Sequence, residues 1–168
     1  MRNAMKKPFY ENGLSFACTR CSRCCVGQPG HVFLSKDDVQ RLLILLSLDF
    51  RRFYEEYCIS IDTGEGVAIS LRETGDHACI LWSVPGCSVY DARPIQCSTY
   101  PFWSSIIESP ESWSRESAEC PGIGIGNPYE RTEIESALYL RRSAGILLLN
   151  SEMDFQPELL DEDKVLGR

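Results

Sequence analysis

The run Cys18-Thr19-Arg20-Cys21-Ser22-Arg23-Cys24-Cys25 places four thiols within eight residues, in the spacing C-x2-C-x2-C-C. Two thiols that lie two residues apart can bind one metal ion. A third thiol at the same interval, with a fourth directly beside it, is hard to explain by packing. The run therefore predicts a metalloprotein whose thiolates form one or two zinc or iron–sulfur sites.

Nine cysteines in 168 residues require an explanation by either disulfides or metal. Residues 1–13 contain Arg2, Lys6 and Lys7 with no apolar run after them, so we expect no secretory signal and a cytoplasmic protein. Clustered cysteines in a reducing compartment more often bind metal than form disulfides, and an odd number cannot all pair. We therefore expect these thiols to bind metal ions.

Charge and hydropathy exclude two classes of partner. The formal net charge of −7 and the pI near 4.9 argue against nucleic acid, which requires a basic surface. The longest apolar segment, Leu42–Leu46, is far shorter than the roughly 20 residues of a membrane helix. We expect neither nucleic acid nor a membrane as a partner.

The first half of the chain contains signals for two helices and a hairpin. Ser35 followed by Asp38 is typical of a capping box, and Asp49 can cap a second helix. Residues 59–71 predict a short β-hairpin around a glycine-rich turn. Together these patterns favour the α+β class, with a helical pair and a few short strands.

The second half is less regular. We expect a short strand over 79–82, one helical turn over 91–97, an extended aromatic stretch over 100–103 and a surface loop over 104–119. A final helix is indicated by Thr132 with Glu135, and its apolar positions are predicted to extend to Leu148 and Leu149.

The predicted organisation is a lead-in over residues 1–13, one cysteine-cluster metal-binding domain over 14–150 and an acidic tail over 151–168. The aromatic and apolar side chains near the lead-in are expected to dock it on the domain. Since so much of the domain is loop, metal cross-links would help to hold it together. The prediction is thus a small, loop-rich, metal-stabilised α+β domain.

Eight of the nine cysteines fall into two sets of four. The first set is Cys18, Cys21, Cys24 and Cys25, and the second is Cys79, Cys87, Cys97 and Cys120. Neighbouring side chains point in different directions along most backbones, so we expect Cys24 and Cys25 to bind different ions, or different metals of one cluster, more easily than one zinc ion. We therefore expect the two sets to interleave, with the vicinal pair where they meet.

The spacing leaves the metal open. Cys18, Cys21 and Cys24, with the remote Cys120-Pro121, partly match the bacterial ferredoxin pattern, which favours an iron–sulfur cluster. C-x2-C pairs are equally typical of zinc. Cys58 lies apart from the other cysteines and is interpreted as a small buried apolar residue.

No other motif marks catalytic chemistry. His31 and His77 lie near cysteines and could be ligands, but loop or surface histidines explain them as well. A cysteine nucleophile needs an activating base, and no pattern here provides one. Whether the protein is an enzyme therefore stays open at this point.

A second motif follows the first. After Cys79 comes Cys87-Ser88-Val89-Tyr90-Asp91-Ala92-Arg93-Pro94-Ile95-Gln96-Cys97-Ser98-Thr99-Tyr100-Pro101-Phe102. With the Cys18–Cys25 run, it resembles the YkgJ-type cysteine-cluster proteins, over about residues 14–126. This resemblance implies zinc or iron chelation by the eight cysteines, with Cys58 outside the pattern. The family also resembles flagellin lysine N-methylases, which makes a protein-modifying enzyme one alternative.

Three residues of the second motif are candidate outer-sphere groups. Arg93, Tyr90 and Tyr100 could donate hydrogen bonds that tune a metal–sulfur centre, or could fix the Cys87–Cys97 segment. Ser98 stands where a common form of the motif has Arg.

The sequence thus predicts a metal-chelating protein that binds an iron–sulfur cluster or zinc in one or two centres. Three alternatives stay open: an iron–sulfur oxidoreductase or electron-transfer role, an enzyme with a protein substrate, and a zinc-stabilised module that binds a protein partner.

Overall fold

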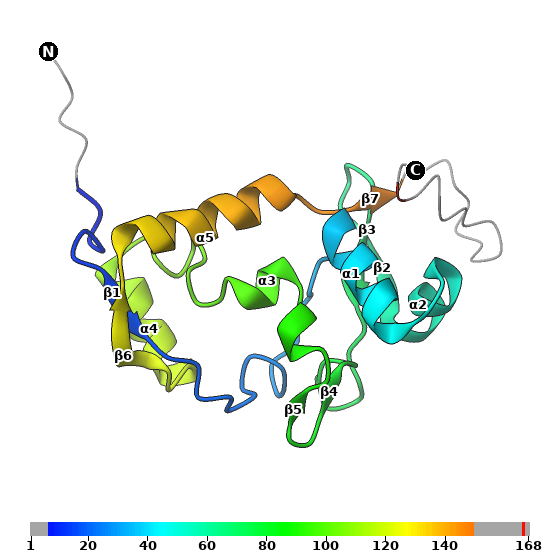
Figure 1. Ribbon diagram of the computed structural model, residues 1–168, viewed down its shortest axis with the longest axis horizontal. Coiled ribbons are helices and arrows are strands. Elements are labelled where there is room, and N and C mark those ends of the chain that lie inside the picture. Colours follow the sequence, from blue (N-terminus) through cyan, green and yellow to red (C-terminus); the bar gives the residue numbers. More distant parts are fainter. Residues whose placement is uncertain (1–6, 150–165, 167–168) are drawn as a thin grey trace, which may run out of the picture. The chain divides into compact units, whose positions relative to one another are not determined.

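The computed structural model describes residues 7–149 and Leu166 (Figure 1). The chain forms two compact units. Unit 1 comprises the described residues of Met1–Cys21 and Thr99–Arg142, and unit 2 those of Ser22–Ser98 and Ser143–Arg168. Both contain short antiparallel strands and helices, which confirms the α+β class. In the described ranges, no helix has the length and apolar character needed to cross a membrane.

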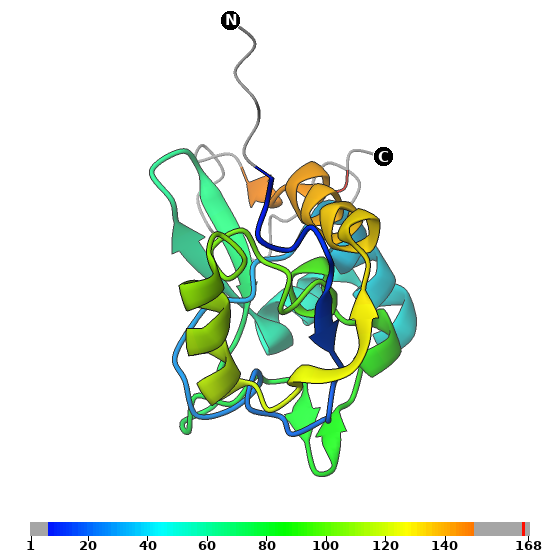
Figure 2. The ribbon, with the colours of Figure 1, turned by 90° about the vertical axis from the view of Figure 1, so that its left-hand side faces the viewer.

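Unit 1 is built on a two-stranded sheet. Strand β1 (Leu14–Phe16) pairs antiparallel with β6 (Ile123–Tyr129), and Figure 2 shows the pair in dark blue and yellow. Helices α4 (Pro110–Glu119) and α5 (Arg131–Ala144) flank β6 in the chain. Gly122 lies against this sheet, since a Cβ there would come 2.4 Å from the carbonyl oxygen of Ala17.

The core of unit 1 is aromatic and aliphatic. Its buried members are Phe102, Ile106, Ile107 and Ile134. The side chains of Phe9, Tyr10, Leu14 and Phe16 pack against them, so the predicted docking of the N-terminal segment is confirmed for the described residues. Residues 1–6 of the predicted lead-in, and the tail over 151–168 apart from Leu166, lie outside the described residues.

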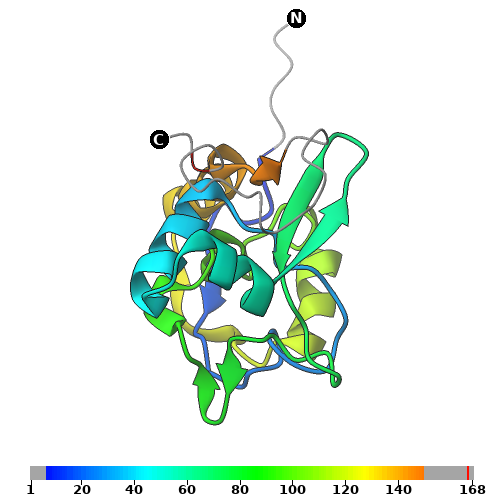
Figure 3. The ribbon, with the colours of Figure 1, turned by 90° about the vertical axis from the view of Figure 1, so that its right-hand side faces the viewer.

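Unit 2 combines two helices with a three-stranded sheet. Helix α1 (Lys36–Leu46) and helix α2 (Phe50–Tyr57) precede the hairpin of β2 (Cys58–Asp62) and β3 (Val67–Leu71). Strand β7 (Leu148–Leu149) pairs with β3 and completes the sheet (Figure 3). The predicted helical pair and hairpin are confirmed.

The cap residues explain where the two helices begin. Ser35 and Asp38 form a reciprocal capping box, and the Asp49 carboxylate accepts a hydrogen bond from the Arg52 amide. The helices bury one face each against the sheet in a core that includes Leu34, Val39, Leu42, Phe50, Phe53, Ile69 and Leu71.

The segment after the hairpin differs from the prediction. The strand expected over 79–82 is only β4 (Trp82–Ser83), which pairs with β5 (Gly86–Cys87). The helical turn expected over 91–97 is divided into η1 (Tyr90–Ala92) and α3 (Ile95–Ser98). Arg93 between them is extended, with φ −56° and ψ 148°. A residue before proline disfavours the helical region, so Pro94 ends the first turn.

Residues 100–103 are not extended, because the backbone amide of Phe102 donates to the Thr99 carbonyl and closes a turn. The loop predicted over 104–119 is also wrong in its second half, where α4 forms. Ser109 caps α4 and Pro110 occupies its first turn, an arrangement that favours a helix start.

The final helix begins and ends earlier than predicted. Glu133 reaches back to the Glu130 amide, at 2.7 Å, so the start is set here rather than at Thr132. Helix α5 ends at Ala144, before Gly145 with φ +67°, the left-handed conformation common after a helix. Leu148 and Leu149 therefore belong to β7 and not to the helix.

Candidate metal centre

Five of the eight predicted ligands lie in unit 2 and three lie in unit 1. Unit 2 contains Cys24, Cys25, Cys79, Cys87 and Cys97, and unit 1 contains Cys18, Cys21 and Cys120. Each of the nine cysteines is a free thiol. The candidate centre is the set of five in unit 2.

The vicinal pair does not diverge as expected. The sulfurs of Cys24 and Cys25 lie 3.7 Å apart. Ser22 has a left-handed backbone with φ 63°, and its carbonyl accepts from the Cys25 amide at 2.8 Å, so the chain turns tightly at the pair. Two thiolates on one tetrahedral zinc, with bonds of about 2.3 Å, are separated by about 3.8 Å. The observed separation matches this spacing, and which ion each sulfur binds stays a prediction.

Cys79 is tied directly to this turn. Its backbone amide donates to the carbonyl of Cys25 at 2.8 Å, which brings two segments 54 positions apart together. The Leu81 amide donates to the Cys79 sulfur, an interaction that stabilises a thiolate. Burial is the larger effect and raises the pKa of the Cys79 thiol.

Cys87 is placed by the small β4–β5 hairpin. It pairs with Trp82 across the two strands. The carbonyl of Leu81 accepts from both the amide and the hydroxyl of Ser88, each at 2.9 Å, and so fastens the base of the hairpin. Cys79 and Cys87 pack against the core of unit 2.

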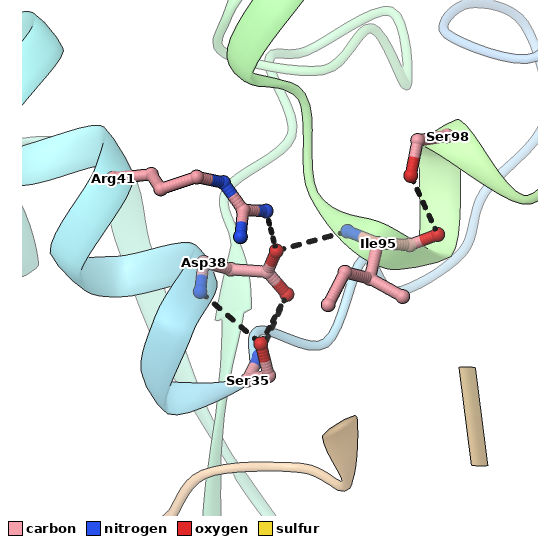
Figure 4. Close-up of polar contacts among 5 residues, drawn as sticks. All are labelled: Ser35, Asp38, Arg41, Ile95 and Ser98. Atoms are coloured by element: carbon pink, nitrogen blue, oxygen red, sulfur yellow. Dashed lines mark hydrogen bonds and ion pairs between the residues drawn. The ribbon is translucent and has the colours of Figure 1, made fainter. Parts of the chain in front are cut away.

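Cys97 lies on α3, and a buried carboxylate holds the start of this helix (Figure 4). Asp38, 1% exposed, accepts from the Ile95 amide at 2.9 Å and forms an ion pair with Arg41. Its other oxygen accepts from the amide and hydroxyl of Ser35, at 2.9 and 2.7 Å. Asp38 thus joins the cap of α1 to the helix that carries Cys97.

Burial raises the pKa of the Cys97 thiol to about 12, with smaller electrostatic contributions from Cys79, Cys24 and Cys87. The neighbouring Gln96 donates to the His31 carbonyl at 2.7 Å, which further ties α3 to the segment after the cysteine run. A thiol of this kind needs a strong partner, such as a metal ion, to lose its proton near neutral pH.

The pKa values of the vicinal thiols are shifted in opposite directions. A hydrogen bond from Cys25 lowers the pKa of Cys24 to about 7, and its own backbone amide and the charge of Arg93 act in the same direction. The pKa of Cys25 is raised, first by its hydrogen bond to Cys24 and then by burial. Within the pair, these effects favour the charged form of Cys24 and the protonated form of Cys25.

The five cysteines of the candidate centre are linked by electrostatic interactions. Every pair among Cys24, Cys25, Cys79 and Cys97 interacts electrostatically, and Cys87 interacts with Cys79 and Cys97. In the described part of the chain, no three His, Cys, Asp or Glu side chains have the spacing of a closed metal site. The donor chemistry fits a thiophilic ion, and rotation of the side chains would have to close the site.

Unit 1 holds its three cysteines differently. Cys18 and Cys21 are exposed, whereas Cys120 is buried at the end of α4. The Tyr100 hydroxyl donates to Glu116 at 2.6 Å and also interacts with the Cys120 thiol. Burial and these two neighbours raise the pKa of Tyr100.

The other two predicted outer-sphere groups lie in unit 2. The guanidinium of Arg93 lies over the ring of Tyr90, 3.9 Å from its centre, and donates to the Tyr90 carbonyl. Its charge acts on Cys24, as described above. Arg93 is thus both a local clamp and a positive group near a thiolate, and Tyr90 supports it.

Cys58 and the two histidines lie outside the candidate centre. Cys58 is 2% exposed in the core of unit 2, which confirms that it is buried. His31 and His77 are exposed, and His77 pairs with Glu73. Asp38 and Trp82 were missed as parts of the site. Asp38 had been recognised only as a cap, and the pairing of Trp82 with Cys87 requires knowledge of the strand register.

Comparison with known proteins identifies the family of this chain. No solved structure matches the chain. A family model described as "Putative zinc- or iron-chelating domain" matches residues 17–121, which include the eight cysteines of the two motifs. The chain belongs to this CxxCxxCC family of metal-chelating domains.

Proposed function

We propose that this protein binds zinc in unit 2 through four of the five thiolates gathered there, with Cys24 and Cys25 on the same ion. The centre would stabilise unit 2, because zinc would add four bonds between its loops. The role proposed is metal chelation, and the centre is redox-silent.

The 3.7 Å separation of the Cys24 and Cys25 sulfurs carries the proposal. It equals the spacing of two thiolates on one tetrahedral ion within about 0.1 Å. In a four-iron cluster each iron takes one cysteine, so two cysteine sulfurs lie on different irons and farther apart. The close pair therefore favours a single ion over such a cluster.

The surrounding residues support a charged thiolate centre. The Leu81 amide donates to Cys79, and the positive charge of Arg93 favours the thiolate of Cys24. The raised pKa of Cys97 means that zinc binding would displace a proton from this thiol. Cys18, Cys21 and Cys120 stay predicted ligands, in unit 1.

Metal analysis of the full chain tests the proposal. After anaerobic purification, zinc, iron and acid-labile sulfide are measured per chain, and X-ray absorption counts the neighbours of the metal. We expect zinc with four sulfur neighbours at about 2.3 Å. Iron with stoichiometric sulfide would overturn the zinc assignment.

Variants test the ligands. Cys24→Ser and Cys25→Ser should each lose the zinc of this centre, because each removes one of its four bonds. Cys58→Ser is the matched control, since Cys58 is buried in the same unit but lies outside the ligand set, and it should keep its zinc. Full zinc occupancy in both vicinal variants would contradict the proposed site.

A further inference from the structure

The indole N–H of Trp82 is a buried donor without an acceptor among the described residues. An indole nitrogen can only donate, so this group needs an acceptor. Buried donors without an acceptor are rare, and each is a reason to look for an absent partner.

The register of the hairpin points to that partner. Trp82 and Cys87 are directly opposite each other in the antiparallel β4–β5 pair, so their side chains lie on the same face. The Trp82 amide donates to the Cys79 carbonyl at 2.8 Å, which fixes the start of β4. With the base of the hairpin closed by Ser88, this pair has little freedom to separate.

A metal-bound thiolate is the acceptor that suits this donor. Its sulfur carries negative charge even where it is buried, and hydrogen bonds to metal-ligating groups orient them and tune the metal. A neutral thiol is only a weak acceptor. The unused donor therefore favours a metal-bound sulfur on the opposite strand as its acceptor.

We propose that Cys87 is one of the four zinc ligands of unit 2, and that Trp82 donates its indole N–H to the metal-bound sulfur of Cys87. This proposal rests on the zinc centre proposed above and names one of its ligands and a positioning residue. Trp82 would hold the Cys87 sulfur in place and favour its charged form.

Nuclear magnetic resonance of the full chain loaded with zinc or with ¹¹³Cd tests the hydrogen bond. The chain has three tryptophans, and Trp82→Phe identifies the indole signal of interest. We expect this indole proton to shift downfield on metal loading and to show coupling to ¹¹³Cd through the sulfur. Cys87→Ser should abolish the coupling.

Competition with a chelator gives the second measurement. Trp82→Phe should weaken metal binding at least about 10-fold, the usual effect of removing such a partner. Trp113→Phe is the matched control, because Trp113 belongs to unit 1, and it should leave the affinity unchanged.

The outcomes separate the two proposals. If the wild-type chain binds zinc with four sulfurs but its Trp82 indole signal neither shifts nor couples, the hydrogen bond is refuted and the zinc centre stands. If Cys87→Ser keeps the full affinity, Cys87 is not a ligand. If the wild-type chain binds no zinc, both proposals fail. If Trp82→Phe does not fold, Trp103→Phe and Trp113→Phe assign the other two indole signals, so the remaining signal is that of Trp82 and the test on the wild-type chain stays decisive.

Discussion

Replacement of Asp38 by alanine should destabilise the protein, because it removes a buried acceptor at the start of α1. The Asp38 carboxylate is the acceptor for two buried amides, those of Ser35 and Ile95, both at 2.9 Å. Alanine leaves both amides without an acceptor and removes the partner of Arg41. The first amide belongs to the cap of α1 and the second to the helix that carries Cys97.

The magnitude follows from these two amides. A buried donor left without an acceptor costs about 1–3 kcal/mol, so two of them give a loss of about 4 kcal/mol in the free energy of unfolding. Asp38→Asn keeps one oxygen acceptor and should lose about half as much. Asp37→Ala is the control: Asp37 lies in the same turn but is exposed, and its loss should cost about 0.3–1 kcal/mol through the helix dipole.

Urea unfolding of the three variants measures these losses as shifts of the midpoint at constant slope. The expected order of stability is wild type, Asp37→Ala, Asp38→Asn and Asp38→Ala. A loss for Asp38→Ala no larger than that for Asp37→Ala would refute the assignment of Asp38 as a buried acceptor shared by α1 and α3.

Two further predictions concern the two cores. Burial raises the pKa of Cys58 from its ordinary 9.0 to about 12, so the folded state holds this proton more tightly. The resulting stability is complete below pH 9 and is lost as the pH rises toward 12. In metal-free protein, the unfolding free energy should fall less steeply between pH 9 and pH 12 in Cys58→Ala than in the wild type, by up to about 1.4 kcal/mol per pH unit. An equal slope in the two proteins would contradict the burial effect. In unit 1, Gly122→Ala should lower the unfolding free energy by about 1–3 kcal/mol, because its Cβ meets the Ala17 carbonyl. Gly75→Ala meets open space and should change the unfolding free energy by less than about 0.5 kcal/mol, and equal effects would refute the steric argument.

Local signals predicted the parts of the fold that depend on neighbours in sequence. Ser35, Asp38 and Asp49 predicted the start of two helices, because a capping side chain bonds to a backbone amide only three residues away in the sequence. Helix α4 was missed because its Ser- and Glu-rich sequence resembles a loop, although Ser109-Pro110 is a start signal. The β7 strand could not be predicted from two leucines, since it forms only by pairing with β3.

The ligand types of the site were predictable, but their arrangement was not. The Cys24 and Cys25 sulfurs lie close together in a turn in which Ser22 has a left-handed backbone, a conformation that serine seldom adopts and that no motif marks. Likewise, the hydrogen bond from Cys79 to Cys25 joins segments that are remote in the sequence. Such contacts arise from tertiary structure and have no local signature.

The boundary between the two units falls inside the cysteine run, after Cys21, and this leads to a last prediction. Arg20 and Ser22, on either side of Cys21, both have positive φ, 53° and 63°, so the chain turns twice within the motif. Cys21 and Cys24 therefore belong to different units although only two residues separate them. Cys24→Ser should remove the zinc of unit 2 and return the Trp82 indole signal to its metal-free position. Cys21→Ser should leave that indole signal in its metal-bound position, whatever metal is lost elsewhere. If Cys21→Ser moves the signal as far as Cys24→Ser does, the thiols of unit 2 do not form a centre by themselves.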